Sequence, residues 1–279
     1  MQPRPQQRVG APRLRVHPGT GLVGTCGHCR KRPGALPRPT MKNIARTLAS
    51  VLVLTYTASA LAQASCSSDG IPHPVAIFER FISADCEACW SDAATPAPSA
   101  TAGVAVLDWI VPGKAGDEAP LSAAATNDAL ARLQTLGRKP PVTTDVHTAA
   151  IEAATPARLR VAHGMPFNDY LGAAIAFTPV QRAAQRNVAT PGAMDFYLLL
   201  VESVPAGTEG TRVARNMVRN MLHGTWEKRE KLSKKEQMKW METRSMRIPE
   251  GAQAERLRMV GWVQDAQGSV LAAAQSTCR

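Results

Sequence analysis

Two cysteines separated by two residues follow the apolar run 75–82, and this arrangement constrains the chain more than any other feature. Cys86 and Cys89 can close a small disulfide, bind a soft metal ion or exchange with the disulfide of a partner protein. Disulfides form and persist in oxidising compartments and are rare in reducing ones. The compartment therefore decides which of these chemistries is open to the pair.

Residues 41–64 have the pattern of a secretory signal peptide. Residues 41–46 form a short basic segment, residues 48–61 are apolar or small, and Ala62-Gln63-Ala64 supplies a small–x–small cleavage site. The apolar stretch is too short, and too interrupted by Ser and Thr, to cross a membrane, which takes about 20 predominantly apolar residues. We therefore expect a mature periplasmic chain that starts after Ala64 and has no stable membrane span.

Residues 1–40 are rich in Pro, Gly and Arg, and we expect them to be a disordered leader added by a start codon assigned too far upstream. Cys26 and Cys29 have no second Cys or His pair at finger-like spacing, so no zinc site is expected there. Residues 1–64 hold ten of the 33 basic residues and no acidic one. The remainder has 23 basic and 22 acidic residues, so its net charge is +1 rather than +11, and no nucleic acid is expected as a partner.

The mature chain retains four cysteines, which allow three pairings. Proximity favours Cys86 with Cys89. This leaves Cys66 and Cys278 to join the ends of the mature chain, a bridge worth roughly 4 to 5 kcal/mol in the chain-entropy model. A lipoprotein would instead be acylated at Cys66, but Gln63 stands where such signals carry an aliphatic residue. We expect Cys66–Cys278 to be structural.

The first part of the mature chain alternates strand-like and helix-like segments. Strands are expected at 75–82 and 104–111, a helix at the Cys pair, and a second helix over 121–136 that ends at Gly137. A further helix is expected over 146–154. Strands that alternate with helices favour parallel pairing in a covered sheet.

The pattern changes beyond residue 156 to short apolar runs separated by Pro, Gly, Asn and Thr. Runs at 170–177, 196–204 and 257–263 indicate an all-β, sandwich-like unit. A hairpin is expected at the end of the chain, with Gly268 in its turn.

Three motifs carry a resemblance to a known family: Glu79-Arg-Phe81-Ile-Ser83-Ala-Asp85-Cys86-Glu-Ala-Cys89, Arg212-x-x-x-Asn216-x-Val218-Arg219, and Trp262-Val263-Gln264-Asp-Ala-Gln-Gly268-Ser-Val270-Leu271-Ala-Ala. Over most of its mature length the chain resembles an uncharacterised secreted thioredoxin-like family of proteobacteria. The resemblance implies an α/β fold, with a thioredoxin-like N-terminal domain at 65–155 and a β-rich C-terminal domain at 156–279. It implies no settled reaction. Trp90 follows the Cys pair where the family tends to place a proline.

A thiol–disulfide oxidoreductase or redox sensor is the first function that these patterns support. Cys86 would attack from a helix N-terminus, which favours the thiolate, and Cys89 would resolve the mixed disulfide. Thioredoxin-like sites place a cis proline beside the thiols, and Pro141 is the best candidate, followed by Pro140. The partners would be envelope proteins that contain thiols or disulfides.

A non-enzymatic envelope module is the alternative, in which the Cys86–Cys89 disulfide is a static link between strand and helix. Three acidic neighbours favour it, because like charges raise the pKa of a thiol: Asp85, Glu87 and Asp92. Glu79 could be a buried proton acceptor behind the thiols or could face solvent. No histidine has ligand spacing relative to the pair, so no metal and no cofactor are expected. Hydrolase and nucleotide chemistry lack support, since no catalytic triad, phosphate loop or metalloprotease motif is present.

Overall fold

The computed structural model describes residues 66–94, 103–151, 157–179, 192–227 and 240–278. The expected leader, the signal peptide and the boundary at 155/156 lie outside these residues. None of the helices in the described ranges is long and apolar enough to span a bilayer.

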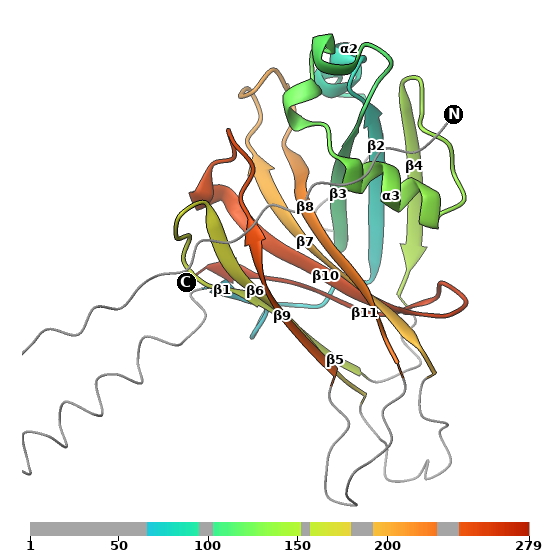
Figure 1. Ribbon diagram of the computed structural model, residues 1–279, viewed down its shortest axis with the longest axis vertical. Helices are drawn as coiled ribbons and strands as arrows, with labels where there is room; N and C mark the ends of the chain where they lie inside the picture. The colour runs from blue at the N-terminus through green and yellow to red at the C-terminus, as the bar shows by residue number, and fades with distance from the viewer. Residues whose placement is uncertain (1–65, 95–102, 152–156, 180–191, 228–239, 279) are drawn as a thin grey trace, which may run out of the picture. The chain divides into compact units, whose positions relative to one another are not determined.

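The strands of the described part form two sheets (Figure 1). The five-stranded sheet has the order β12-β1-β5-β6-β9, and the seven-stranded sheet has the order β11-β10-β7-β8-β3-β2-β4. The strands are β1 Cys66–Ser67, β2 Ala76–Ser83, β3 Val104–Val111, β4 Thr144–Ala150, β5 Ala157–His163, β6 Tyr170–Pro179, β7 Met194–Val204, β8 Arg215–Trp226, β9 Trp240–Arg247, β10 Leu257–Asp265, β11 Val270–Gln275 and β12 Thr277–Cys278. The α-helices are α2 Glu87–Ser91 and α3 Asn127–Thr135, and 3₁₀ turns lie at Gly116–Glu118, Ser122–Ala124 and Ala254–Arg256.

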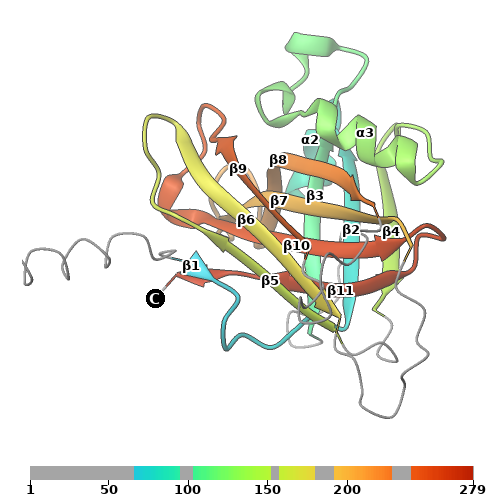
Figure 2. The same cartoon turned by 60° about the horizontal axis from the view of Figure 1, so that its bottom comes forward.

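The centre of the seven-stranded sheet is buried on both faces, which explains why β7 is apolar at consecutive positions. Leu198 and Leu200 belong to the core shared with the five-stranded sheet. Leu199 belongs to a second core on the opposite face, where α3 packs through Ala129 and Leu133. The two sheets and α3 thus form successive layers (Figure 2).

Gly261 on β10 permits close contact between the two sheets. A Cβ atom at this position would lie 2.8 Å from a methyl group of Val161 on β5 and 3.1 Å from a methyl group of Ile175 on β6. Interiors are close-packed, so a larger residue here would force the sheets apart.

The predicted α/β thioredoxin-like fold is wrong. β2 and β3 are parallel, but the other neighbour of β2 is the antiparallel strand β4, in the region where a helix over 146–154 was predicted. Residues of β4 alternate between half-buried and exposed positions, as expected of an edge strand, and its alanine content concealed this period. The other neighbour of β3 is the parallel strand β8, so the sheet extends through strands from much later in the chain. The described part is mostly β structure, arranged as a two-sheet sandwich.

Several local predictions are confirmed. Strands form at or near each of the five predicted apolar runs, and the C-terminal hairpin joins β10 to β11 with Gly268 at φ +85°. Gly137 follows α3 at φ +66°, a left-handed conformation that favours glycine after a helix. Cys66 and Cys278 form a disulfide, which leaves no Cys66 sulfur for a lipid thioether.

The contact between the parallel strands β3 and β8 is a single bridge, between Asp108 and Met217. The Asp108 carboxylate reinforces it from a fully buried position. Its Oδ2 accepts a hydrogen bond from the backbone N–H of Asn216 at 2.7 Å, and its Oδ1 accepts one from Nε of Arg80 at 2.7 Å. A side chain therefore supplies the strand-to-strand bonding that the backbones do not.

A second carboxylate binds the backbone of β8 beyond this bridge. Asp128 of α3 accepts a hydrogen bond from the backbone N–H of Met221 on β8 at 2.8 Å. Burial raises the pKa of Asp128, and this hydrogen bond opposes the rise. The helix thus satisfies a backbone group of β8 beyond the bridge.

Asp108→Asn should lower the free energy of unfolding by about 3–5 kcal/mol, because it removes the charge that the buried Arg80 guanidinium contacts. Urea unfolding measures this loss. Glu242→Gln is the matched control: its partner Arg244 is largely exposed, so the loss should stay below about 1 kcal/mol. Arg80→Met added to Asp108→Asn should restore part of the stability. Equal losses for Asp108→Asn and Glu242→Gln would contradict this account.

Candidate functional site

The Cys86–Cys89 pair lies at the start of α2, directly after β2. Its sulfur atoms form a disulfide with an S–S distance of 1.97 Å. Cys86 is the N-cap residue, and its Sγ accepts a hydrogen bond from the backbone N–H of Cys89 at 3.3 Å. Both cysteines are half-buried. The structure therefore brings the two predicted residues together as an oxidised pair.

Trp90 anchors α2 to the sheet. The side chain is 2% exposed and packs in a cluster with Ile82 and Ile110, on the face of β2 and β3 opposite α3. Its indole Nε1 donates a hydrogen bond to the carbonyl of Glu209 at 2.7 Å. A buried tryptophan with a satisfied N–H leaves the short helix little freedom to move.

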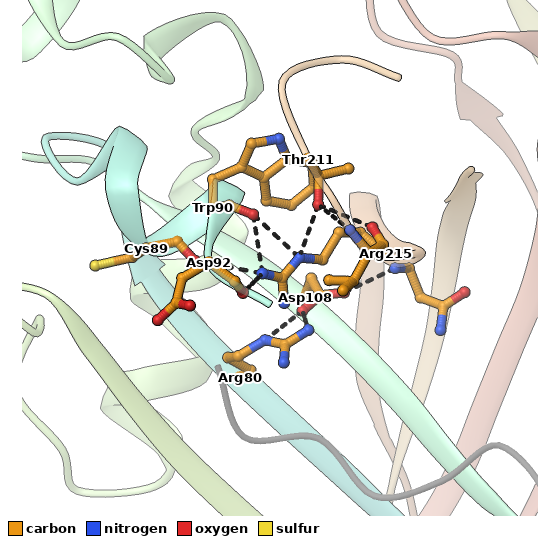
Figure 3. Close-up of polar contacts among 9 residues, drawn as sticks. Arg80, Cys89, Trp90, Asp92, Asp108, Thr211 and Arg215 are labelled. Carbon is orange, nitrogen blue, oxygen red and sulfur yellow. Dashed lines mark hydrogen bonds and ion pairs between the residues drawn. The ribbon is translucent and has the colours of Figure 1, made fainter. Parts of the chain in front are cut away.

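Arg215, the first residue of β8, binds the backbone at the end of α2 (Figure 3). Its Nη2 donates to the carbonyl oxygens of Trp90 at 2.8 Å, Asp92 at 2.9 Å and Cys89 at 3.3 Å. Its Nε donates to Thr211 Oγ1 and to the Trp90 carbonyl, each at 3.3 Å. The guanidinium also lies over the Trp90 ring, 5.5 Å from its centre. Arg215 thus satisfies carbonyl groups that a helix end leaves unpaired, with a cation at the negative end of the helix dipole.

Asp108 links this arrangement to β2. Figure 3 shows its carboxylate between the guanidinium groups of Arg80 and Arg215. Burial lowers the pKa of Arg215, the charge of Arg80 lowers it further, and the Asp108 carboxylate opposes both effects. Arg215 is 1% exposed, so the carboxylate balances two buried positive charges.

Two of the three acidic neighbours of the Cys pair, Asp85 and Asp92, are engaged in local structure. Asp85 accepts hydrogen bonds from the backbone N–H groups of Lys114 at 2.7 Å and Ala115 at 3.2 Å. Gly113 makes room for this contact, because a Cβ there would lie 2.1 Å from Asp85 Oδ1. Asp92 accepts from the N–H of Ala94 at 2.8 Å. Asp85 therefore ties the start of α2 to the loop after β3.

Pro141 precedes β4, in the loop whose Thr143 carbonyl accepts the N–H of Ser83 at 2.8 Å. The loop therefore meets the same end of β2 that leads to Cys86. The peptide bonds before Pro140 and Pro141 are both trans. The cis proline expected of a thioredoxin-like site is not formed at either position.

Glu79 neither faces solvent nor lies behind the thiols, because it is on the face of β2 opposite α2. It is fully buried and pairs with Arg132 of α3, with 2.6 Å between Oε2 and Nη2, and accepts a hydrogen bond from Trp109 Nε1 at 3.2 Å. The Arg132 guanidinium also lies over the rings of Tyr197 and Trp262, at 4.8 Å and 5.1 Å. This pair fastens α3 to the sheet.

Sequence reasoning did not identify Arg215, Arg80 or Arg132 as parts of buried sites. A signal was available for two of the contacts, because Glu79-Arg80 and Asp108 interrupt strands that are otherwise apolar. Charged residues are almost never fully buried unless paired. Nothing in the sequence shows that Arg215 would reach α2, since the contact spans 125 residues.

Comparisons with known proteins assign no family. No family model and no curated protein matches the chain. A solved structure, HBP35 of Porphyromonas gingivalis, is similar over 74% of this chain and 76% of that chain, with 12% sequence identity and a TM-score of 0.41. A likeness at this level assigns neither a fold nor a function.

Stability should fall as the pH drops below about 6.5, because burial lowers the pKa of three histidines from their usual value of 6.5: His147, His163 and His223. Below that pH the unfolded chain binds protons that the folded chain does not, so acid favours unfolding. Thermal unfolding at pH values of about 7.5 and 5.5 measures the effect. His147→Gln and His223→Gln should each reduce the dependence on pH. A dependence that is unchanged in both variants would contradict the assignment.

Proposed function

We propose that this chain is an exported, non-enzymatic binding or structural module of the cell envelope, in which Cys86–Cys89 is a static disulfide. The observation that carries the proposal is the contact of Arg215 with the backbone at the end of α2. Export is supported by the signal-like pattern at 41–64 and by the two disulfides, which are typical of oxidising compartments.

Disulfide exchange needs an accessible sulfur, and the two sulfur atoms of the pair must separate when their bond is broken. Here the carbonyl of Cys89 is held by a buried arginine, and Trp90 is inserted into the core. Asp85 holds the other end of the helix through two backbone N–H groups. These contacts favour a fixed link over a pair that opens and closes.

A redox role at the same pair is the second candidate, and the half-buried position of both cysteines favours it. Cys86 would attack and Cys89 would resolve. Its partners would be envelope proteins with thiols or disulfides. The peptide bonds before Pro140 and Pro141 are trans, and the described strands form a two-sheet sandwich instead of a thioredoxin-like sheet, so two features on which that role was expected to depend are not found there.

Titration of the purified full chain with dithiol and glutathione buffers separates the two candidates. Alkylation of free thiols and mass spectrometry report which cysteines have been reduced. A static Cys86–Cys89 disulfide should stay oxidised at potentials near that of the glutathione pool, because structural disulfides have reduction potentials below about −300 mV. Cys89→Ser should trap no mixed disulfide with a model disulfide substrate. Reduction at a higher potential together with a trapped mixed disulfide would support the redox role and overturn the proposal.

Arg215→Gln tests the contact that carries the proposal. The substitution removes the charge and two of the donors that hold α2, so the Cys86–Cys89 disulfide should be reduced at least several-fold faster than in the unmodified chain. Rates of alkylation under a fixed dithiol concentration measure this. Arg256→Gln, at a half-exposed ion pair with Glu209, is the control and should leave the rate unchanged. Equal rates in all three proteins would show that Arg215 does not restrain the pair.

Removing each disulfide should have unequal effects on stability. Cys66→Ser with Cys278→Ser opens a link that spans 212 residues, and should cost about 5 kcal/mol in the chain-entropy model. Cys86→Ser with Cys89→Ser opens a link that spans 3 residues, and should cost about 2 kcal/mol. Urea unfolding of both double variants checks the order. A larger loss for the second variant would contradict it.

A further inference from the structure

The Cys66–Cys278 disulfide lies in one row with His163 across three neighbouring strands. Cys66 on β1 is the register partner of Cys278 on β12 and also of His163 at the end of β5. The two sulfur atoms and a ring nitrogen of His163 lie within 4.8 Å of one another. In the part of the chain that the structure describes, this row contains the cysteines and histidine that could share a metal ion, and the Cys86–Cys89 pair does not take part in it.

The surroundings of His163 fix its tautomer. Nδ1 lies 3.0 Å from the carbonyl oxygen of Gly164, and because a carbonyl can only accept, Nδ1 carries the proton. The lone pair of the neutral ring is then on Nε2. Metal-binding histidines commonly donate their other ring N–H to a backbone carbonyl in this way, which orients the ring. His163 and Cys66 are buried, whereas Cys278 is exposed and gives solvent access.

We propose that the reduced form of this row binds one Zn²⁺ through Sγ of Cys66, Sγ of Cys278 and Nε2 of His163. A dithiol reductant supplies the two electrons: the S–S bond breaks, two protein thiols form, and the reductant becomes a disulfide. Zn²⁺ then displaces the two thiol protons to water and binds two thiolates. The neutral imidazole contributes its lone pair, and a water molecule completes the tetrahedron on the exposed side.

The required movements are small. Zn–S bonds of about 2.3 Å and Zn–N bonds of about 2.0–2.1 Å place tetrahedral ligands about 3.5–3.8 Å apart. The sulfur atoms are bonded to each other in the disulfide, so they must separate by about 2 Å. Cys278 lies on the two-residue edge strand β12, which pairs with β1 alone, so it can move without disturbing β5.

The ion would connect the same strands that the disulfide connects. When the disulfide is open, zinc would therefore replace the covalent link between the ends of the described part. This inference concerns a different pair of cysteines from the function proposed above and does not depend on it.

Cobalt(II), which gives a visible and near-ultraviolet spectrum with thiolate ligands, is the probe for the test. The full chain carries Cys26→Ser, Cys29→Ser, Cys86→Ser and Cys89→Ser, so that only the proposed cysteines remain. After reduction it should bind one Co²⁺ per chain with a thiolate charge-transfer band, release two protons, and lose the band when Zn²⁺ is added. The oxidised protein should show no band.

His163→Gln should weaken Co²⁺ binding by about tenfold or more, since it removes a ligand while both thiols remain. His73→Gln, at an exposed histidine, is the matched control and should leave the affinity unchanged. Circular dichroism reports whether the reduced chain is folded. The proposal is overturned if the reduced chain binds no Co²⁺, if His163→Gln binds it as tightly, or if the reduced chain unfolds and the metal does not restore the fold.

Discussion

The carboxylate of Asp108 is the interaction on which the rest of the structure depends. Its residue supplies the single backbone bridge between β3 and β8, and its two oxygens bind Asn216 on one side and Arg80 on the other. The bridge joins strands β4, β2 and β3 to the four strands that form the remainder of the sheet, and the Asp128 hydrogen bond to β8 and a shared apolar core support it. The site at α2 depends on the same carboxylate, because Arg215 lies beside it and reaches the Cys pair from the other strand (Figure 3).

Two adjacent charged residues of β2 serve opposite faces of the sheet. Side chains alternate along a strand, so Glu79 points toward α3 and Arg80 points toward α2. Each meets an opposite charge from a different element, Arg132 and Asp108 respectively. A buried ion pair adds little net stability compared with an apolar pair, but leaving one partner alone is costly, so Glu79–Arg132 holds α3 against β2 and Arg80–Asp108 holds β2 beside β3. The half-buried cysteine pair is fixed in place because Arg215, which lies beside Asp108, binds the backbone of α2.

The elements that could be predicted from the sequence are the strands that appear in it as short apolar runs. The runs at 104–111 and 196–204 are apolar except for Asp108, Glu202 and Ser203, and short apolar runs of this kind are typical of strands buried on both faces. The strand over 144–150 was missed because its alanine and threonine content is compatible with a helix, and its pairing with β2 decided the outcome. The thioredoxin-like arrangement was wrong because strand order depends on contacts such as Asp108 with Asn216, which join residues 108 positions apart. The pairing of Cys86 with Cys89 was predicted correctly, but the arginine that binds the backbone of α2 was not predicted, for the same reason.

The link between Cys66 and Cys278 has a mechanical consequence. The two residues lie on adjacent strands, and nearly the whole described chain is enclosed between them. A force that pulls on the segments outside this pair passes directly through the sulfur–sulfur bond, so the sheets carry none of the load. Likewise, a protease that cuts one connection between strands leaves two pieces that are still covalently joined. The fold is therefore a closed loop, protected against stretching and against a single cut while the bond is intact.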